Sequence, residues 1–235
     1  MSGEEIRKVF MILLEYLGPT LKIFGFTLLY SIPLGMIVAL LKMCRFKPIS
    51  WLTNIYILIM RGTPLMLQII VAYYAVPMLK QNDKLPEFIQ SFLSGINIQD
   101  DNFMFNAIIV AFSLNYAAYF AEIFRGGIES IPKGQYEAGA VLGLTKTQVF
   151  FKVVLLQVIK RIIPPMGNEF LTLVKDTSLA NTIMIYEITW NAKRMMNSEH
   201  ILWPLFYSGV FYLALCGILT LIFNYLEKKL DYYKG

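Results

Sequence analysis

Stretches of about twenty mostly apolar residues recur along the whole chain and constrain its fold more than any other feature. A helix needs roughly 20 such residues to cross a bilayer, and only helices and closed barrels satisfy their backbone hydrogen bonds in lipid. Only 16% of the 235 residues are charged, against about 25% in soluble domains. The sequence therefore predicts an all-α, polytopic membrane protein. The predicted transmembrane helices are residues 20–41, 51–79, 103–124, 148–174 and 201–226.

The second and fourth of these stretches depart from a simple span. Residues 51–79 are too long for one upright crossing at about 1.5 Å per residue, and Arg61-Gly-Thr-Pro64 interrupts them. Because a residue before proline avoids helical dihedrals, we expect a helix along the cytoplasmic interface that bends and then crosses. Residues 148–174 contain several charges and two prolines. We retain them as a span because charges in a membrane helix usually face a protein interior or a wet cavity.

Positive charges between the spans predict the orientation. Lys42, Arg45 and Lys47 follow the first span with no acid among them, and Lys228 and Lys229 close the last span. Since cytoplasmic loops are enriched in lysine and arginine, both sites are expected in the cytoplasm. The N-terminus then lies outside and the C-terminus inside. The loop before the fourth span also lies inside.

The sequence lacks the motifs of nucleotide hydrolysis and of metal binding. No phosphate-binding loop G-x-x-x-x-G-K-[ST] is present, because Gly143-Leu-Thr-Lys146 lacks the second glycine. His200 is the only histidine, and neither it nor Cys44 or Cys216 has partners at ligand spacing. We therefore expect no metal site, no cofactor and no disulfide. The net charge of +5 is spread between apolar spans, which argues against a nucleic-acid partner.

A short helix is expected between the third and fourth spans, on the cytoplasmic side. Pro132 punctuates the chain, the helix begins at about Gln135, and Gly143 ends it. Glu137 suits the positive N-terminal end of such a helix. The next residues are small and suit insertion into a partner's groove: Ala138, Gly139 and Ala140. By composition alone, an ordinary interfacial helix is the favoured interpretation of this segment.

This segment resembles the EAA loop of ABC importer permeases, in Glu137-Ala-Gly139 followed by Gly143. Other segments are similar to permeases for polar amino acids, of the histidine, arginine, glutamine and cystine type. They are Arg61-Gly-Thr-Pro-Leu65 with Gln68, Tyr119-Phe-Ala-Glu-Ile-Phe-Arg125, Ser130-Ile-Pro-Lys-Gly-Gln135, Gly167-Asn-Glu-Phe170 and Lys175-Asp-Thr-Ser-Leu179. The resemblance implies a type I ABC importer permease fold as one domain over residues 1–235, with a coupling loop at about 132–146.

The resemblance also implies a function and a set of partners. The chain would form the pathway for a polar amino acid in a bacterial plasma membrane and hydrolyse nothing itself. Its partners would be two copies of an ATP-binding subunit, a second identical or different permease subunit, and an external substrate-binding protein. Glu137, Ala138, Gly139 and Gly143 match the loop that couples to the ATPase. Gly139 stands where the family motif has alanine, a small-for-small change that should preserve docking.

Acidic residues within the predicted fourth span are candidates for a substrate site. Glu169 and Asp176 are seven residues apart, or two helical turns, and could share one face of a helix. Ionisable residues inside a membrane are functional hypotheses by default. Alternatively, Asp176 caps an outer turn or pairs with Lys175. The resemblance favours a midmembrane substrate cavity that Glu169 and Asp176 line.

Other polar residues in the spans have two readings each. Asn168, Asn115 and Gln68 are candidate neutral contacts to substrate, although such residues more often join helices. Arg61 could anchor at the membrane interface, which we favour, or attract a carboxylate. For Glu122, an ion pair with Arg125 is favoured over contact with a ligand.

The residues alone leave two other functions open. An ion-coupled secondary transporter usually has repeated halves with broken helices in corresponding positions, whereas this chain has a single predicted break. An intramembrane enzyme could use Glu169 and Asp176 as an acid–base pair, but the sequence offers no nucleophile–base set.

Overall fold

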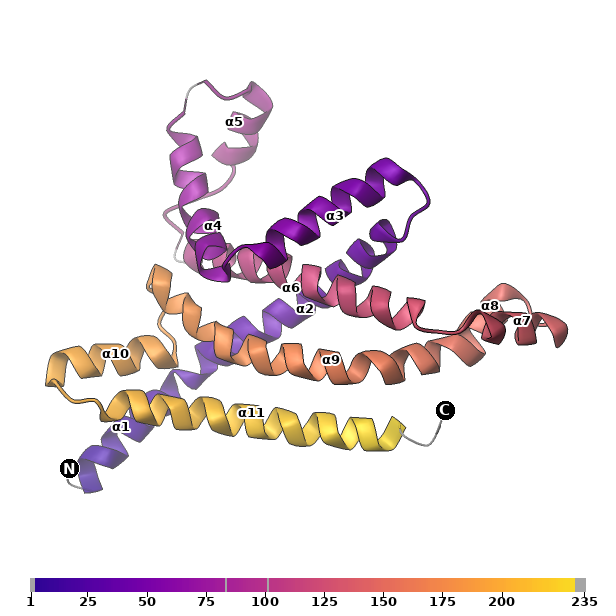
Figure 1. Cartoon of the computed structure of the whole chain (residues 1–235). Helices are drawn as coiled ribbons and strands as arrows, with labels where there is room; N and C mark the ends of the chain where they lie inside the picture. Colours follow the sequence, from indigo (N-terminus) through magenta and orange to yellow (C-terminus); the bar gives the residue numbers. More distant parts are fainter. Residues whose placement is uncertain (1–2, 83, 101, 231–235) are drawn as a thin grey trace.

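The computed structural model describes residues 3–82, 84–100 and 102–230, and the regular elements in these ranges are all helical. Figure 1 shows their arrangement. The α-helices are α1 (Gly3–Glu15), α2 (Leu17–Lys42), α3 (Lys47–Gly62), α4 (Leu65–Lys80), α5 (Glu87–Ser94), α6 (Phe103–Glu129), α7 (Lys133–Val141), α8 (Lys146–Val149), α9 (Leu155–Asp176), α10 (Ile188–Glu199) and α11 (Trp203–Leu230). A π-helical turn (Phe150–Val154) joins α8 to α9, and a 3₁₀ helix (Thr177–Ile183) follows α9.

Helices α2 and α6 form the centre of the molecule. Gly35 of α2 lies so close to α6 that a Cβ atom there would stand 2.7 Å from Cβ of Phe120 and 3.0 Å from the carbonyl oxygen of Ala117. Helix α6 is buried along most of its length, whereas α11 buries few residues. The main core therefore follows α6 and takes apolar side chains from α2, α4 and α9. Its fully buried members include Ile23, Ile69, Ile108, Phe112, Phe120 and Leu173.

Three described helical segments are long and apolar enough to span a membrane: Ile6–Lys42, Phe103–Glu129 and Trp203–Leu230. The first joins α1 to α2, and at 1.5 Å per residue its 37 residues extend about 55 Å, more than the roughly 30 Å of hydrocarbon. The sequence did not predict α1. Helix α1 is packed against the rest of the chain through Val9 and Leu13, which contact residues of α10 and α11.

The predicted break in the second stretch is confirmed. Helices α3 and α4 meet at an angle of 107° across Thr63 and Pro64, and together they are apolar enough to form one broken span or a re-entrant loop. Thr63 is extended, with φ −116° and ψ 147°, as the proline after it requires. The helix begins at Lys47, four residues before the predicted start at Trp51.

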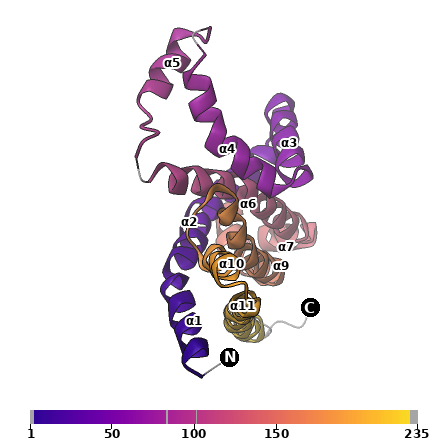
Figure 2. The ribbon, with the colours of Figure 1, turned by 90° about the vertical axis from the view of Figure 1, so that its left-hand side faces the viewer.

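The predicted fourth span is helical but too polar to count as a span by hydropathy, so its crossing of the membrane stays a prediction. Helical structure runs from Lys146 to Asp176, and Pro164 and Pro165 lie inside α9 without ending it. Its buried residues are Val158, Ile162, Gly167, Leu173 and Val174. Val158 and Ile162 lie against Gly127 of α6, whereas Gly167 lies against Phe223 of α11. In Figure 1, α7 and α8 lie at one end of the molecule and α1 and α10 at the other. Figure 2 shows α4 and α5 extending away from α11.

Candidate functional site

The short helix predicted between the third and fourth spans is present as α7, and its role in coupling stays a prediction. It begins at Lys133, two residues before the predicted start, directly after Pro132. Its last residue is Val141, and the predicted stop at Gly143 follows two residues later with a left-handed φ of 73°. The N–H of Gly143 donates to the carbonyl of Ala140 and the N–H of Leu144 to that of Gly139, both at 3.0 Å. These two bonds form a Schellman motif, which satisfies the last carbonyls of the helix and reverses the chain.

The faces of α7 divide its residues into two groups. Glu137 and Ala138 are exposed, as a docking surface requires. Gly139 instead faces α8, where a Cβ atom would lie 2.3 Å from Cγ2 of Val149. Its small size therefore lets α7 and α8 pack together within the chain. Two neighbouring apolar side chains at the end of α7 are highly exposed, Val141 at 88% and Leu142 at 77%.

Local hydrogen bonds hold the return from α7 to α9. Thr145 and Gln148 form a capping box: the Gln148 N–H donates to Oγ1 of Thr145 at 3.3 Å, and the Thr145 N–H donates to Oε1 of Gln148 at 2.9 Å. Nε2 of Gln157 on α9 donates to Oε1 of Gln135 on α7 at 3.3 Å. Helices α7 and α8 and the turn between them therefore form a folded unit that is hydrogen-bonded to α9.

The structure places the two predicted acidic residues on α9 beside α6. Asp176 is half-buried and accepts a hydrogen bond of 2.7 Å from the hydroxyl of buried Tyr116. Glu169 is half-buried and lies within electrostatic range of Asp176 and of Arg61 on α3. Asn168 is exposed. Sequence reasoning missed Tyr116, because no local pattern links two residues that are 60 positions apart.

Gln68 and Asn115 join helices at the break between α3 and α4. Nδ2 of Asn115 donates to the Met60 carbonyl at 2.8 Å and to Oε1 of Gln68 at 3.0 Å. Nε2 of Gln68 donates to the Met60 carbonyl and to Oγ1 of Thr63 at 3.0 Å and 2.8 Å. These bonds satisfy the Met60 carbonyl, which the break leaves without its helical partner. The two side chains therefore have the helix-joining role in this structure, while their contact with substrate stays a prediction.

Glu122 forms the ion pair that the sequence favoured. Its carboxylate accepts from Nη2 of Arg125 at 2.7 Å and also pairs with Nζ of Lys42 at the end of α2. Arg125 bonds Glu129 at 2.5 Å as well. This network links α2 to α6 near the broken helix.

Glu187, before α10, is a buried acid that sequence reasoning missed. Its carboxylate accepts from the N–H groups of Thr189 and Trp190 at 2.7 Å and 2.6 Å, and from the hydroxyl of Tyr212 on α11 at 2.9 Å. Burial raises the pKa of this carboxyl above its ordinary value, against the opposing effect of these donors. An acid at the start of a helix is the signal that could have revealed the cap.

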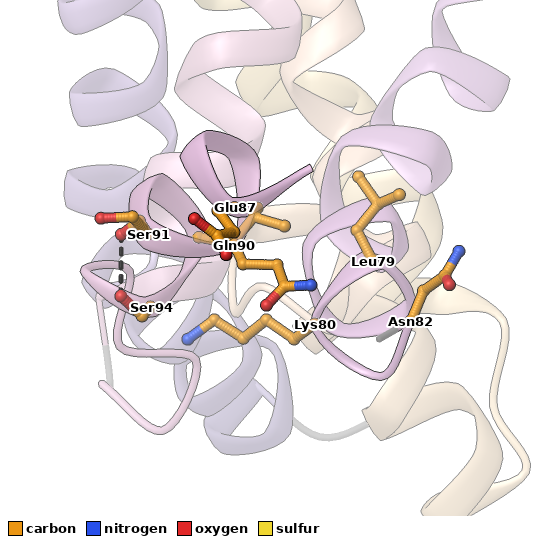
Figure 3. Close-up of a pocket in the computed structure, with 8 residues that line it drawn as sticks. Leu79, Lys80, Asn82, Glu87, Gln90, Ser91 and Ser94 are labelled. Carbon is orange, nitrogen blue, oxygen red and sulfur yellow. Dashed lines mark hydrogen bonds between the residues drawn. The ribbon is translucent and has the colours of Figure 1, made fainter. Parts of the chain in front are cut away.

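Two surface cavities differ in their relation to these residues. A cavity of about 610 Å³ lies between α4 and α5 (Figure 3), and none of the predicted site residues lines it. A second, of about 390 Å³, lies beside the break after α3. It is lined by Lys42, Asn54, Ile57, Leu58, Arg61, Gly62 and Glu122. Over the described part of the chain, no three His, Cys, Asp or Glu residues cluster as metal ligands.

Comparison with known proteins identifies relatives over most of the chain. The model of the family "Binding-protein-dependent transport system inner membrane component" matches residues 31–232. The L-cystine transport system permease protein TcyB of Bacillus subtilis is 34% identical over 87% of this chain and 80% of its own length. The arginine transport system permease protein ArtQ of the same organism is 34% identical over 93% of this chain and 92% of its own.

A solved structure shares the whole fold. It is described as an amino acid ABC transporter with histidines, and its chain superimposes with a TM-score of 0.78 at 26% identity, covering 97% of this chain and 99% of that one. The family match spans the broken helix, α7 and the acidic residues of α9 together. This chain therefore belongs to the family of binding-protein-dependent transport system inner membrane components, as an ABC permease subunit.

Proposed function

We propose that this permease subunit forms the translocation pathway of an ABC importer for polar amino acids in a bacterial plasma membrane. The observation that carries the proposal is α7, an exposed helix at one end of the molecule that carries Glu137-Ala-Gly139 and closes on Gly143. Relatives named as cystine and arginine permeases support the substrate class.

In the proposed topology the chain crosses the membrane five times. The spans are α2, the broken pair α3–α4, α6, α9 and α11, with α7 and α8 in the cytoplasm. The lysines at the end of α11 and Lys42 at the end of α2 support this orientation. A polar α9 fits the scheme, because its buried residues pack on α6 and α11 and its charges would line a wet pathway between two permease subunits.

The coupling step follows from the surface of α7. ATP-binding subunits would hold Glu137, Ala138 and the exposed pair Val141 and Leu142 in a groove. Because the loop is fastened to α9 by Gln135 and Gln157, movement of α7 would pass directly to the helix that carries Glu169. ATP then shifts the equilibrium between inward and outward states only if it favours one of them.

The acids of α9 supply a reason for the substrate class. An ammonium group, which every free amino acid carries, is attracted to carboxylates such as Glu169 and Asp176. Tyr116 holds Asp176 in place through its 2.7 Å bond. Asn168, exposed on α9, is the neutral partner with no hydrogen bond from its side chain in the described structure.

The test is ATP-dependent uptake of labelled amino acids by proteoliposomes that contain the permease, its ATP-binding subunits and its binding protein. Glu137→Arg should abolish most of the uptake, because it reverses the charge on the docking face. Glu227→Arg makes the same change at an exposed position of α11 and serves as the matched control. Uptake that an ion gradient drives without ATP would contradict the proposal and favour a secondary transporter.

A further inference from the structure

Arg61 stands at the point where the second predicted span breaks. It is in the last turn of α3, next to Gly62 and the extended Thr63. Its guanidinium carbon lies 5.0 Å from the centroid of the Tyr119 ring, a cation–π contact with α6.

The donors of Arg61 are unused among the described residues. The structure gives its guanidinium no hydrogen bond and no ion pair there, whereas Lys42, Glu122 and Arg125 are paired with one another. An exposed arginine within a membrane span is costly unless it meets water or a counter-ion. Arg61 therefore borders a wet space.

The space beside Arg61 is the cavity of about 390 Å³ between α2, α3 and α6. Its volume lies in the range of small-molecule sites, about 300–1,000 Å³. Apolar side chains of Ile57 and Leu58 line it together with the amide of Asn54. A planar guanidinium binds a carboxylate through two parallel hydrogen bonds, which a lysine cannot reproduce.

Charges of alternating sign link this cavity to the acids of α9. Glu169 is within electrostatic range of Arg61, and Arg61 in turn lines the surface cavity together with Glu122 and Lys42. A zwitterion could thus place its ammonium group toward Glu169 while its carboxylate meets Arg61. Arg61 lies in the last turn of α3, immediately before the 107° break.

We propose that Arg61 binds the α-carboxylate of the transported amino acid in the cavity between α2, α3 and α6. The inference rests on the proposed import of amino acids and assigns Arg61 as a specificity-determining residue. It explains how the pathway would distinguish an amino acid from the corresponding amine, which carries the same side chain and ammonium group.

The test measures equilibrium binding to the permease–ATPase complex in nanodiscs, without the binding protein. The probes are three pairs that differ by one carboxylate at each α-carbon: L-arginine and agmatine, L-glutamine and 4-aminobutanamide, and L-cystine and cystamine. We expect wild type to bind the transported amino acid at least about tenfold more tightly than its amine, the size expected of a charge-assisted bidentate contact. Arg61→Gln should reduce this ratio to within about twofold by weakening the amino acid alone.

Two further variants keep the result interpretable. Arg61→Lys preserves the charge and should retain an intermediate ratio, so it provides the same readout if Arg61→Gln does not assemble. Arg45→Gln removes an exposed arginine outside the cavity and should leave the ratio unchanged. A wild-type ratio near one, a ratio unaffected by either Arg61 variant, or equal weakening of both probes would overturn the inference. Failure of the proposed function is seen separately, as wild-type proteoliposomes that show no ATP-driven uptake.

Discussion

Gly139 of α7 lies directly against Val149 of α8, so close that a Cβ atom on Gly139 would meet Cγ2 of Val149 at 2.3 Å. Real Cβ atoms do not approach another atom this closely, so a larger residue requires a shift of the Val149 side chain or of α7 against α8. Substitutions at Gly139 therefore test whether the packing of α7 on α8 matters for coupling, independently of the residues that α7 exposes.

Gly139→Ala is expected to loosen α7, because overpacking at a tight contact costs about 1–3 kcal/mol. Trypsin should then cut faster at Lys133 and Lys146, which flank the helix. Adding Val149→Ala removes the two clashing methyl groups and leaves a Cβ contact of 3.3 Å, so the double variant should regain resistance. A Cβ atom at Gly134 would meet no other atom within 4 Å, so Gly134→Ala should keep its resistance to trypsin. Equal protease rates in all three variants would refute the packing role.

The exposed end of α7 gives a second prediction. Burial of Val141 and Leu142 in a partner's groove would contribute about 1.5–3 kcal/mol for each side chain. Serine at either position should therefore weaken the affinity for the ATP-binding subunit by about tenfold to a hundredfold. The control is serine at Val210 and Leu213 of α11, which are also exposed. Titration of the labelled ATP-binding subunit onto permease in nanodiscs measures the affinity of the α7 variants and of the α11 controls. A similar loss of affinity in the controls would contradict binding of Val141 and Leu142 in a specific groove.

Features that depend on neighbouring residues were predicted best from the sequence. Pro64 restricts Thr63 and Gly143 adopts a left-handed φ, so both the break and the end of α7 follow from local chemistry. Contacts between distant residues could not be predicted in this way. Lys42 and Glu122 are 80 positions apart, and only the packing of α2 along α6 brings them together.

Three helices, α1, α5 and α10, escaped prediction because they are short or polar. Helix α10 has twelve residues of mixed polarity, so neither its length nor its periodicity separates it from a loop. Helix α1 carries charges in its first turns and becomes recognisable only when Val9 and Leu13 pack on α10 and α11. The buried acid Glu187 belongs to the same region, since its partner Tyr212 lies 25 positions away.

Tyr116→Phe removes only the hydroxyl that bonds Asp176. A hydrogen bond to a charged group contributes about 1.5–3 kcal/mol, so the KM for uptake should rise about tenfold or more if Asp176 meets the substrate. Basal ATP hydrolysis should not change. Tyr56→Phe is the matched control, because its hydroxyl bonds only the Leu114 carbonyl, at 2.5 Å, away from the acids. If both variants alter KM equally, or if both only lower the unfolding temperature, the Tyr116 bond is structural.

Glu187 predicts a pH dependence of stability in the cluster of α1, α10 and α11. Burial raises the pKa of this carboxyl in the folded protein, so the folded state binds its proton more tightly than the unfolded state does. The resulting stabilisation is fully present below the ordinary carboxyl pKa and is lost as the pH rises through the raised value. Glu187→Gln stays neutral while its side-chain oxygen can still accept from Thr189 and Trp190.

The unfolding temperature of Glu187→Gln relative to wild type should therefore increase between about pH 4 and about pH 8. Glu199→Gln, an exposed change at the end of the same helix, should follow wild type throughout. Thermal unfolding in nanodiscs, followed by the fluorescence of Trp190 and Trp203 beside this cluster, measures the difference. If the unfolding temperature of Glu187→Gln relative to wild type instead falls with pH, the three hydrogen-bond donors stabilise the Glu187 carboxylate by more than burial destabilises it. In that case the carboxylate would be an ionised cap that α10 needs at neutral pH.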